Sequence, residues 1–210
     1  AKYHRLGFGF ASSQVITSRD IAGAHLAGCP QSTRWGVIAA DEPQNDLQLS
    51  QLQRLDGNLS AVDAVDAVLF LSSANWDARR QTDLIKSLSA QPRPVLVANP
   101  DLVAPRETFL SLEPGFFAHD IQDKTQITPR FFGKPYANSF EAVRKRMDDA
   151  SIPAHRIAMV GDSLHTDILG GAAAGWRTVL VTGYGLLRGR DVMEDIGRYG
   201  IVPDFIVPQP

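Results

Sequence analysis

Residues 156–185 read RIAMVGDSLHTDILGGAAAGWRTVLVTGYG, and this stretch decides the fold class. The apolar run 157–160 stops at a Gly-Asp pair, which is typical of a buried parallel strand. The small residues of 168–174 predict a helix, which Thr166 and Asp167 can cap. A second apolar run follows at 178–181. The order of strand, helix and strand predicts two parallel strands joined by a right-handed crossover.

Two aspartates flank the predicted loop between the first strand and the helix. Ligands of such sheets bind beyond the carboxyl ends of the strands, and Asp162 falls at that edge. Two carboxylates about 4 Å apart repel by roughly 1 to 4 kcal/mol unless a cation lies between them. Mg²⁺ suits a site with few carboxylates that also holds a phosphate. The alternative makes Asp167 an N-cap and Asp162 a turn residue, and a bare GDxxxxD leaves both readings open.

The same segment resembles the fourth motif of the haloacid dehalogenase (HAD) superfamily of phosphohydrolases. Its form, G-D-S-L-x-T-D-I-x-G-G-x-x-A-G followed by T-x-L-V-T-G, is similar to class IIA, which includes bacterial sugar, nucleotide and p-nitrophenyl phosphatases. The resemblance implies an α/β fold with a Rossmann-like parallel-sheet core and an inserted, smaller α/β cap domain. By this resemblance the core comprises residues 1–30 and 129–210, and the cap comprises residues 33–128.

The region before this segment also alternates between strands and helices, which predicts a second, smaller α/β unit. The expected strands are 35–39, 65–71 and 94–98, and the expected helices are 46–55 and 77–88. The last strand ends in Asn99-Pro100-Asp101, which is also an ordinary turn sequence. Class IIA caps carry an NPD sequence, so the resemblance implies that Asn99 and Asp101 lie at the rim of the cap and bind substrate.

Lys134 lies in a Gly-Lys-Pro sequence before a predicted helix at 136–149, and Pro135 suits the first helical position. A lysine at a helix N-terminus opposes the macrodipole by a few tenths to about 1 kcal/mol, and a bound anion would reverse that cost. A solvated loop lysine is the alternative. The order GKP then GDSLHTD resembles the third and fourth HAD motifs, which implies that Lys134, Asp162 and Asp167 are catalytic and that the two aspartates bind Mg²⁺.

The DxDG sequence that supplies the HAD nucleophile does not occur in this chain. Asp41 is followed by Glu-Pro-Gln and Asp101 by Leu-Val, so the resemblance starts late, as if two βα units were absent from the front. A truncated chain, a fragment and a natural non-enzyme all remain open, and the first is preferred. This chain alone is expected to be inactive.

The resemblance implies a Mg²⁺-dependent phosphatase that hydrolyses small phosphorylated metabolites through an aspartyl-phosphate, with its nucleophile upstream. The alternative is an inactive HAD-like module that binds Mg²⁺, phosphate or a partner. A receiver-like α/β domain also uses acidic strand ends and a lysine, but the long cap-like insertion counts against it.

Composition narrows the partners that we expect. The 210 residues are 44% hydrophobic and carry a net charge of −2, with no basic run that would indicate nucleic acid. The lone Cys29 fits a reducing compartment, and no apolar stretch approaches membrane-spanning length. We therefore expect a cytoplasmic protein whose partner is a small metabolite, and a homo-oligomer is left open. His165 has no neighbouring His or Cys in the sequence and is expected to be a partly exposed loop residue.

Overall fold

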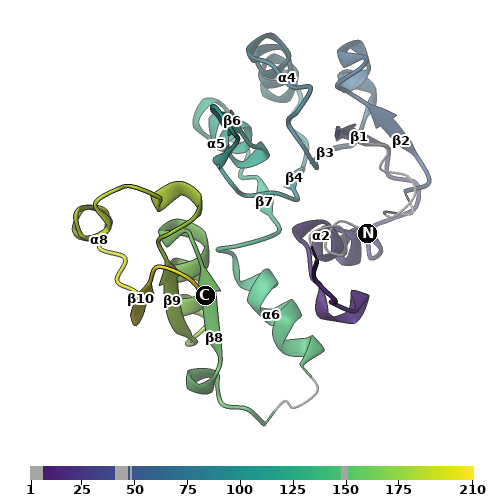
Figure 1. The fold of residues 1–210 in the computed structure, drawn as a ribbon. Helices are drawn as coiled ribbons and strands as arrows, with labels where there is room; N and C mark the ends of the chain where they lie inside the picture. The colour runs from purple at the N-terminus through teal and green to yellow at the C-terminus, as the bar shows by residue number, and fades with distance from the viewer. Residues whose placement is uncertain (1–6, 41–46, 48, 148–150) are drawn as a thin grey trace.

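The structure is a computed structural model that describes residues 7–40, 47, 49–147 and 151–210 (Figure 1). Its larger sheet has five parallel strands in the order β2-β1-β3-β4-β7. Their bounds are Leu52–Arg54 for β2, Trp35–Ile38 for β1, Ala67–Phe70 for β3, Val95–Val97 for β4 and Arg130–Phe131 for β7. Every residue of β1, β3 and β4 is buried, as expected for strands that are covered on both faces.

Helices cover both faces of this sheet. Successive side chains of a strand point to opposite faces, so Val68 and Phe70 lie in one apolar cluster and Ala67 and Leu69 in another. The first cluster includes residues of η2 (Leu59–Ala64), α4 (Ala78–Ala90) and α5 (Pro114–Lys124). The second includes Ala22 and Leu26 of α2 (Ser18–Leu26). The sheet therefore forms the middle of three layers.

A smaller parallel sheet, β10-β9-β8, contains the GDSLHTD segment at its carboxyl edge. Its strands are β10 (Phe205–Val207), β9 (Arg177–Val181) and β8 (Ala158–Gly161). Between β8 and β9 the chain forms η4 (Leu164–Ile168), a π-helical turn, and α7 (Leu169–Ala173). After β9 come η5 (Gly185–Leu187) and α8 (Val192–Tyr199). The parallel pairing of the two strands that the sequence predicts here is confirmed.

The chain passes from the larger sheet to the smaller one after β7, through α6 (Ala137–Arg146) and η3 (Ala154–Arg156) (Figure 1). An antiparallel hairpin of β5 (Val103–Pro105) and β6 (Leu110–Leu112) lies between β4 and α5 in the sequence. Helix α2 packs against the larger sheet and β7 pairs with β4 within it, although both fall in the segments predicted as core. The domain boundaries of 1–30, 33–128 and 129–210 stay a prediction.

Several local expectations are wrong. Residues 52–54, expected as helix, form strand β2. Pro135 precedes α6 instead of starting it, because α6 begins at Ala137. Asp167 is not an N-cap, because the π-helical turn already begins at Leu164. Residues 46 and 48 of the helix expected at 46–55, and Asp41, lie outside the described residues.

The α/β class with parallel sheets, predicted from the sequence, is confirmed. Within the described ranges, none of the helices has the length and apolar character needed to cross a membrane.

Candidate active site

Lys134 and Asp167 meet in the folded chain although 33 positions separate them. The Lys134 ammonium forms an ion pair with Oδ1 of Asp167. The side chain of Asp167 is only 2% exposed, whereas that of Lys134 is 46% exposed. The second oxygen of Asp167 accepts a hydrogen bond of 3.2 Å from the backbone N–H of Ser163. A buried carboxylate is tolerated when both oxygens have donors, so this geometry accounts for the charge at residue 167.

Gly161, the last residue of β8, provides the space that the Asp167 carboxylate occupies. A Cβ atom on Gly161 would lie 2.2 Å from Cγ of Asp167, which no side chain could tolerate. Asp167 itself lies in the π-helical turn η4, and such turns are frequent at functional sites. The turn directs the carboxylate back over the end of β8. Glycine at 161 is therefore a requirement of the site as well as of the strand.

Asp162 follows β8 and lies against the loop after β9. Gly185 of that loop has a φ of +69°, and a Cβ atom there would lie 1.6 Å from Oδ2 of Asp162. Asp162 lines a cavity of about 320 Å³ together with exposed His165. The His165 ring packs edge-on against Tyr199, with the ring centroids 4.4 Å apart.

Asn99 and Asp101 line a second cavity, of about 220 Å³, together with Lys134. Thr17 and Ser18, at the start of α2, also line it.

Gly133 allows three segments to meet at this second cavity. Its φ is +128°, and a Cβ atom would lie 2.6 Å from Cδ of Pro100 and 3.0 Å from Cβ of Ser18. Lys134 follows directly in the chain. The loop after β4, the start of α2 and the residue before Lys134 are therefore packed together without an intervening side chain.

The electrostatics of the site are dominated by carboxylates. Burial is the largest cause that raises the pKa of Asp101 above its usual range, and the positive charge of Lys134 opposes this rise. Three further carboxylates raise the pKa of Asp101 as well: Asp167, Glu113 and Asp162. One lysine thus faces four acidic side chains, and an added cation would relieve their repulsion.

Magnesium fits the donors that the site offers. Among the residues that the structure describes, no group of three or more His, Cys, Asp or Glu side chains is arranged to hold a metal ion. Mg²⁺ commonly uses one or two carboxylates and completes its shell with phosphate oxygens and waters. Asp162 and Asp167 would supply those carboxylates.

Sequence reasoning did not identify two residues that support the site. The Asn138 side chain accepts a hydrogen bond from the backbone N–H of Gly133 (3.1 Å) and donates to the carbonyl of Phe131 (2.8 Å), which fixes the chain before Lys134. Glu113 accepts a hydrogen bond of 3.1 Å from the Asn99 side chain. An Asn near a predicted helix start is a recognisable signal for local backbone bonding. A glutamate before a proline gives no comparable signal.

Parts of the chain are similar to known proteins. Residues 131–209 match the family model described as HAD-hydrolase-like. Bargin from Homo sapiens is 32% identical over 121 residues, which are 55% of this chain and 17% of Bargin. The acid sugar phosphatase of Staphylococcus aureus strain USA300 is 28% identical over 107 residues, which are 51% of this chain and 38% of that enzyme. The chain thus spans less than half of the length of either relative.

A solved structure matches nearly the whole chain. It is described as a possible sugar phosphatase of the HAD superfamily from Cytophaga hutchinsonii, with 25% identity and a TM-score of 0.78. The match covers 99% of this chain and 75% of that one. Residues 131–209 are thus similar to HAD-type hydrolases, and the fold of nearly the whole chain is similar to that of a HAD-superfamily protein. The sequence motifs resemble those of class IIA of this superfamily.

Proposed function

We propose that this protein is a Mg²⁺-dependent phosphatase that hydrolyses small phosphorylated metabolites of the sugar phosphate, nucleotide or p-nitrophenyl phosphate type. The observation that carries the proposal is the ion pair between Lys134 and buried Asp167, beside the cavity that Asp101 lines. A lysine that already has a carboxylate partner can exchange it for a phosphoryl oxygen when a cation takes up the carboxylate.

Each predicted residue has a role in this proposal. The ammonium of Lys134 offsets charge on the phosphoryl oxygens, which is the main task of a protein in phosphoryl transfer. Asp162 and Asp167 hold the magnesium ion, which acts as a Lewis acid when bound. Asn99 and Asp101 face the substrate from the cavity that they share with Lys134. The nucleophilic aspartate, which would form the aspartyl-phosphate, is expected upstream of this chain.

The second candidate is a regulatory module that binds Mg²⁺, phosphate or a partner without turnover. It needs only the Lys134–Asp167 pair and the acidic side chains around it, which lie within the described residues. A cytoplasmic location and a small-metabolite partner, without nucleic acid or membrane, stay predictions, and a homo-oligomer is left open.

Titration calorimetry with Mg²⁺ and inorganic phosphate, combined with a p-nitrophenyl phosphate assay, tests both candidates. We expect the 210-residue chain to bind phosphate only when Mg²⁺ is present, and Lys134→Ala and Asp162→Ala to abolish that binding. We expect no turnover by this chain. Turnover that disappears in Lys134→Ala would contradict the expected inactivity, and a chain that binds neither ion would contradict the proposed site. Turnover by a longer natural polypeptide that carries DxDG would decide between phosphatase and module.

A further inference from the structure

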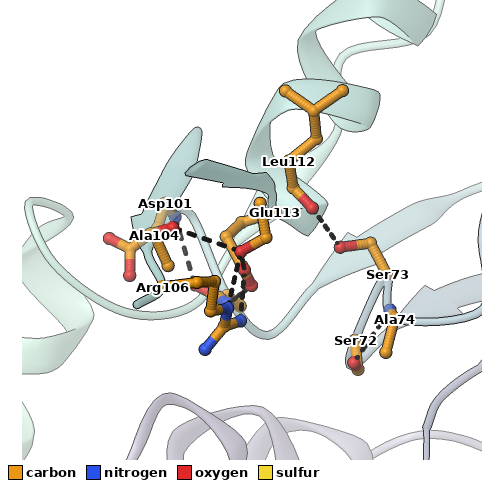
Figure 2. Close-up of polar contacts among 10 residues, drawn as sticks. Ser72, Ser73, Ala74, Asp101, Ala104, Arg106, Leu112 and Glu113 are labelled. Carbon is orange, nitrogen blue, oxygen red and sulfur yellow. Dashed lines mark hydrogen bonds and ion pairs between the residues drawn. The ribbon is translucent and has the colours of Figure 1, made fainter. Parts of the chain in front are cut away.

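Glu113 is a buried carboxylate between the β5–β6 hairpin and the loop after β4. The residue is 8% exposed and lies directly before α5. Figure 2 shows its side chain beside Arg106, with the Asp101 segment next to it. Three donors reach its two oxygens: Arg106 Nη2 at 2.9 Å, Ser111 Oγ at 2.6 Å and Asn99 Nδ2 at 3.1 Å. Both oxygens of this buried glutamate therefore have hydrogen-bond donors.

The two oxygens of Glu113 serve different parts of the chain. Oε1 accepts from Arg106 and Ser111, both in the hairpin, and Arg106 Nε donates in turn to Ser111 Oγ at 3.0 Å. Oε2 accepts from Asn99, which belongs to the loop that lines the cavity of Lys134. One carboxylate therefore connects the hairpin to this loop.

The contact with Glu113 fixes how Asn99 supports Asp101. Because the Asn99 amide donates to Glu113, its oxygen is free to accept from the backbone N–H of Asp101, at 3.2 Å. Two backbone bonds from the same segment hold the loop further. The N–H of Glu113 donates to the carbonyl of Leu102, and that of Gly115 to the carbonyl of Asp101, each at 3.0 Å.

The start of α5 also packs tightly on this loop. A Cβ atom on Gly115 would lie 2.0 Å from the carbonyl oxygen of Pro100. The loop therefore has little room to adopt another conformation while the segment that carries Glu113 stays in place.

We propose that Glu113 is a positioning residue that holds Asn99, and through it Asp101, in the cavity beside Lys134. The placement of both residues then depends on the conformation of the β5–β6 hairpin. The importance of this placement for a substrate rests on the proposed function, whereas the contacts themselves do not.

Glutamine in place of Glu113 separates the two sets of contacts. A glutamine has one acceptor oxygen and one NH₂ donor, so it cannot accept hydrogen bonds at both former oxygen positions. Turning its NH₂ group toward Asn99 loses one contact between neutral groups, whereas turning it toward the hairpin loses the charged contact with Arg106 and forces the Ser111 hydroxyl to change from donor to acceptor. The first orientation costs less, so Glu113→Gln releases the Asn99 amide and spares the hairpin.

The experiment is solution NMR of the 210-residue chain, comparing Glu113→Gln with Glu107→Gln. Glu107 is an exposed residue of the same hairpin, so its substitution makes the same chemical change away from Asn99. We expect Glu113→Gln to shift the resonances of the Asn99 side-chain amide and the Asp101 backbone amide. We also expect hydrogen exchange at the Asn99 amide to become about tenfold faster, as for the loss of one buried hydrogen bond. Glu107→Gln should change neither.

A role confined to the stability of the hairpin would lower Tm and leave the Asn99 and Asp101 resonances unchanged, and that result would overturn the proposal. If Glu113→Gln does not fold, Glu113→Asp replaces it. The aspartate keeps the charge for Arg106, but its shorter side chain should withdraw from Asn99 and shift the same resonances; unchanged resonances again overturn the proposal. The amide measurements need neither Mg²⁺ nor phosphate. A wild-type chain that binds neither ion therefore counts against the proposed function alone.

Discussion

Lys134 has two carboxylate neighbours, Asp167 and Asp101, and their surroundings have opposite effects on the negative charge. Asp167 is almost fully buried, yet an ammonium and a backbone amide supply donors to both of its oxygens. Asp101 is partly buried, and its pKa is raised by that burial and by the carboxylates around it. The fold thus compensates the negative charge at 167 and opposes the negative charge at 101.

The two carboxylates therefore differ in what a bound group could add to each. Both oxygens of Asp167 have donors within the protein, one from Lys134 and one from the backbone N–H of Ser163. At Asp101 three neighbouring carboxylates oppose its negative charge and one lysine favours it, so an added cation or a protonated group of a substrate would be stabilised there. The predictions below test each side.

The largest effect is expected from Lys134→Met, which leaves the Asp167 carboxylate buried without its cation. Breaking a fully buried pair costs about 3 to 5 kcal/mol, and the half-exposed lysine places this case near 3 kcal/mol. Urea unfolding measures the loss. Adding Asp167→Asn should restore part of it, because the uncompensated charge is then gone.

Lys124→Met is the matched control for this substitution. Lys124 also pairs with an aspartate, Asp120 at 2.6 Å, but that carboxylate is 24% exposed. Its loss should cost less than about 1 kcal/mol, as for most surface pairs. If Lys134→Met and Lys124→Met lower the free energy of unfolding equally, the claim that Lys134 compensates the buried charge of Asp167 is refuted.

Gly161→Ala is expected to have the next largest effect, because its methyl group would occupy the place of the Asp167 carboxylate. Forced overpacking of this kind costs about 2 kcal/mol in the free energy of unfolding, and the ion pair with Lys134 should open. Gly57→Ala is the control, since a Cβ atom there meets no atom within 4 Å. A Gly161→Ala protein as stable as the wild type would show that Asp167 can move without cost.

Asp101→Asn is expected to have the smallest effect and the opposite sign. A carboxyl group whose pKa is raised on folding contributes stability that is present at low pH and lost as pH rises through the folded pKa. At pH 7 the asparagine variant should therefore melt at a higher temperature than the wild type. Below about pH 4, where aspartate is protonated in both states, the two melting temperatures should converge. An Asp101→Asn variant with a lower melting temperature than the wild type at pH 7 would contradict the raised pKa of Asp101.

Part of this structure could be predicted because the signals are local. Apolar runs that end at Gly-Asp or Thr-Gly predict β8 and β9, and motif order relates Lys134 to the two aspartates. The ion pair joins Lys134 to Asp167, while the catalytic and metal-binding roles stay predictions.

Other features depend on contacts that sequence periodicity does not record. Strand β2 reads Leu-Gln-Arg and is only partly buried, so its pairing with β1 decides its conformation. The contacts of Glu113 could not be predicted from the sequence either. Its three donors lie 14, 7 and 2 positions away, and only the hairpin brings them together.

The lack of a side chain at Gly133 has a consequence for redesign. Pro100 and Ser18 both occupy the space that a side chain at residue 133 would need, so no side chain there separates either of them from the chain that leads to the neighbouring lysine. A transplanted 99–101 loop must therefore keep the shape of the original at Pro100, whatever new chemistry it brings.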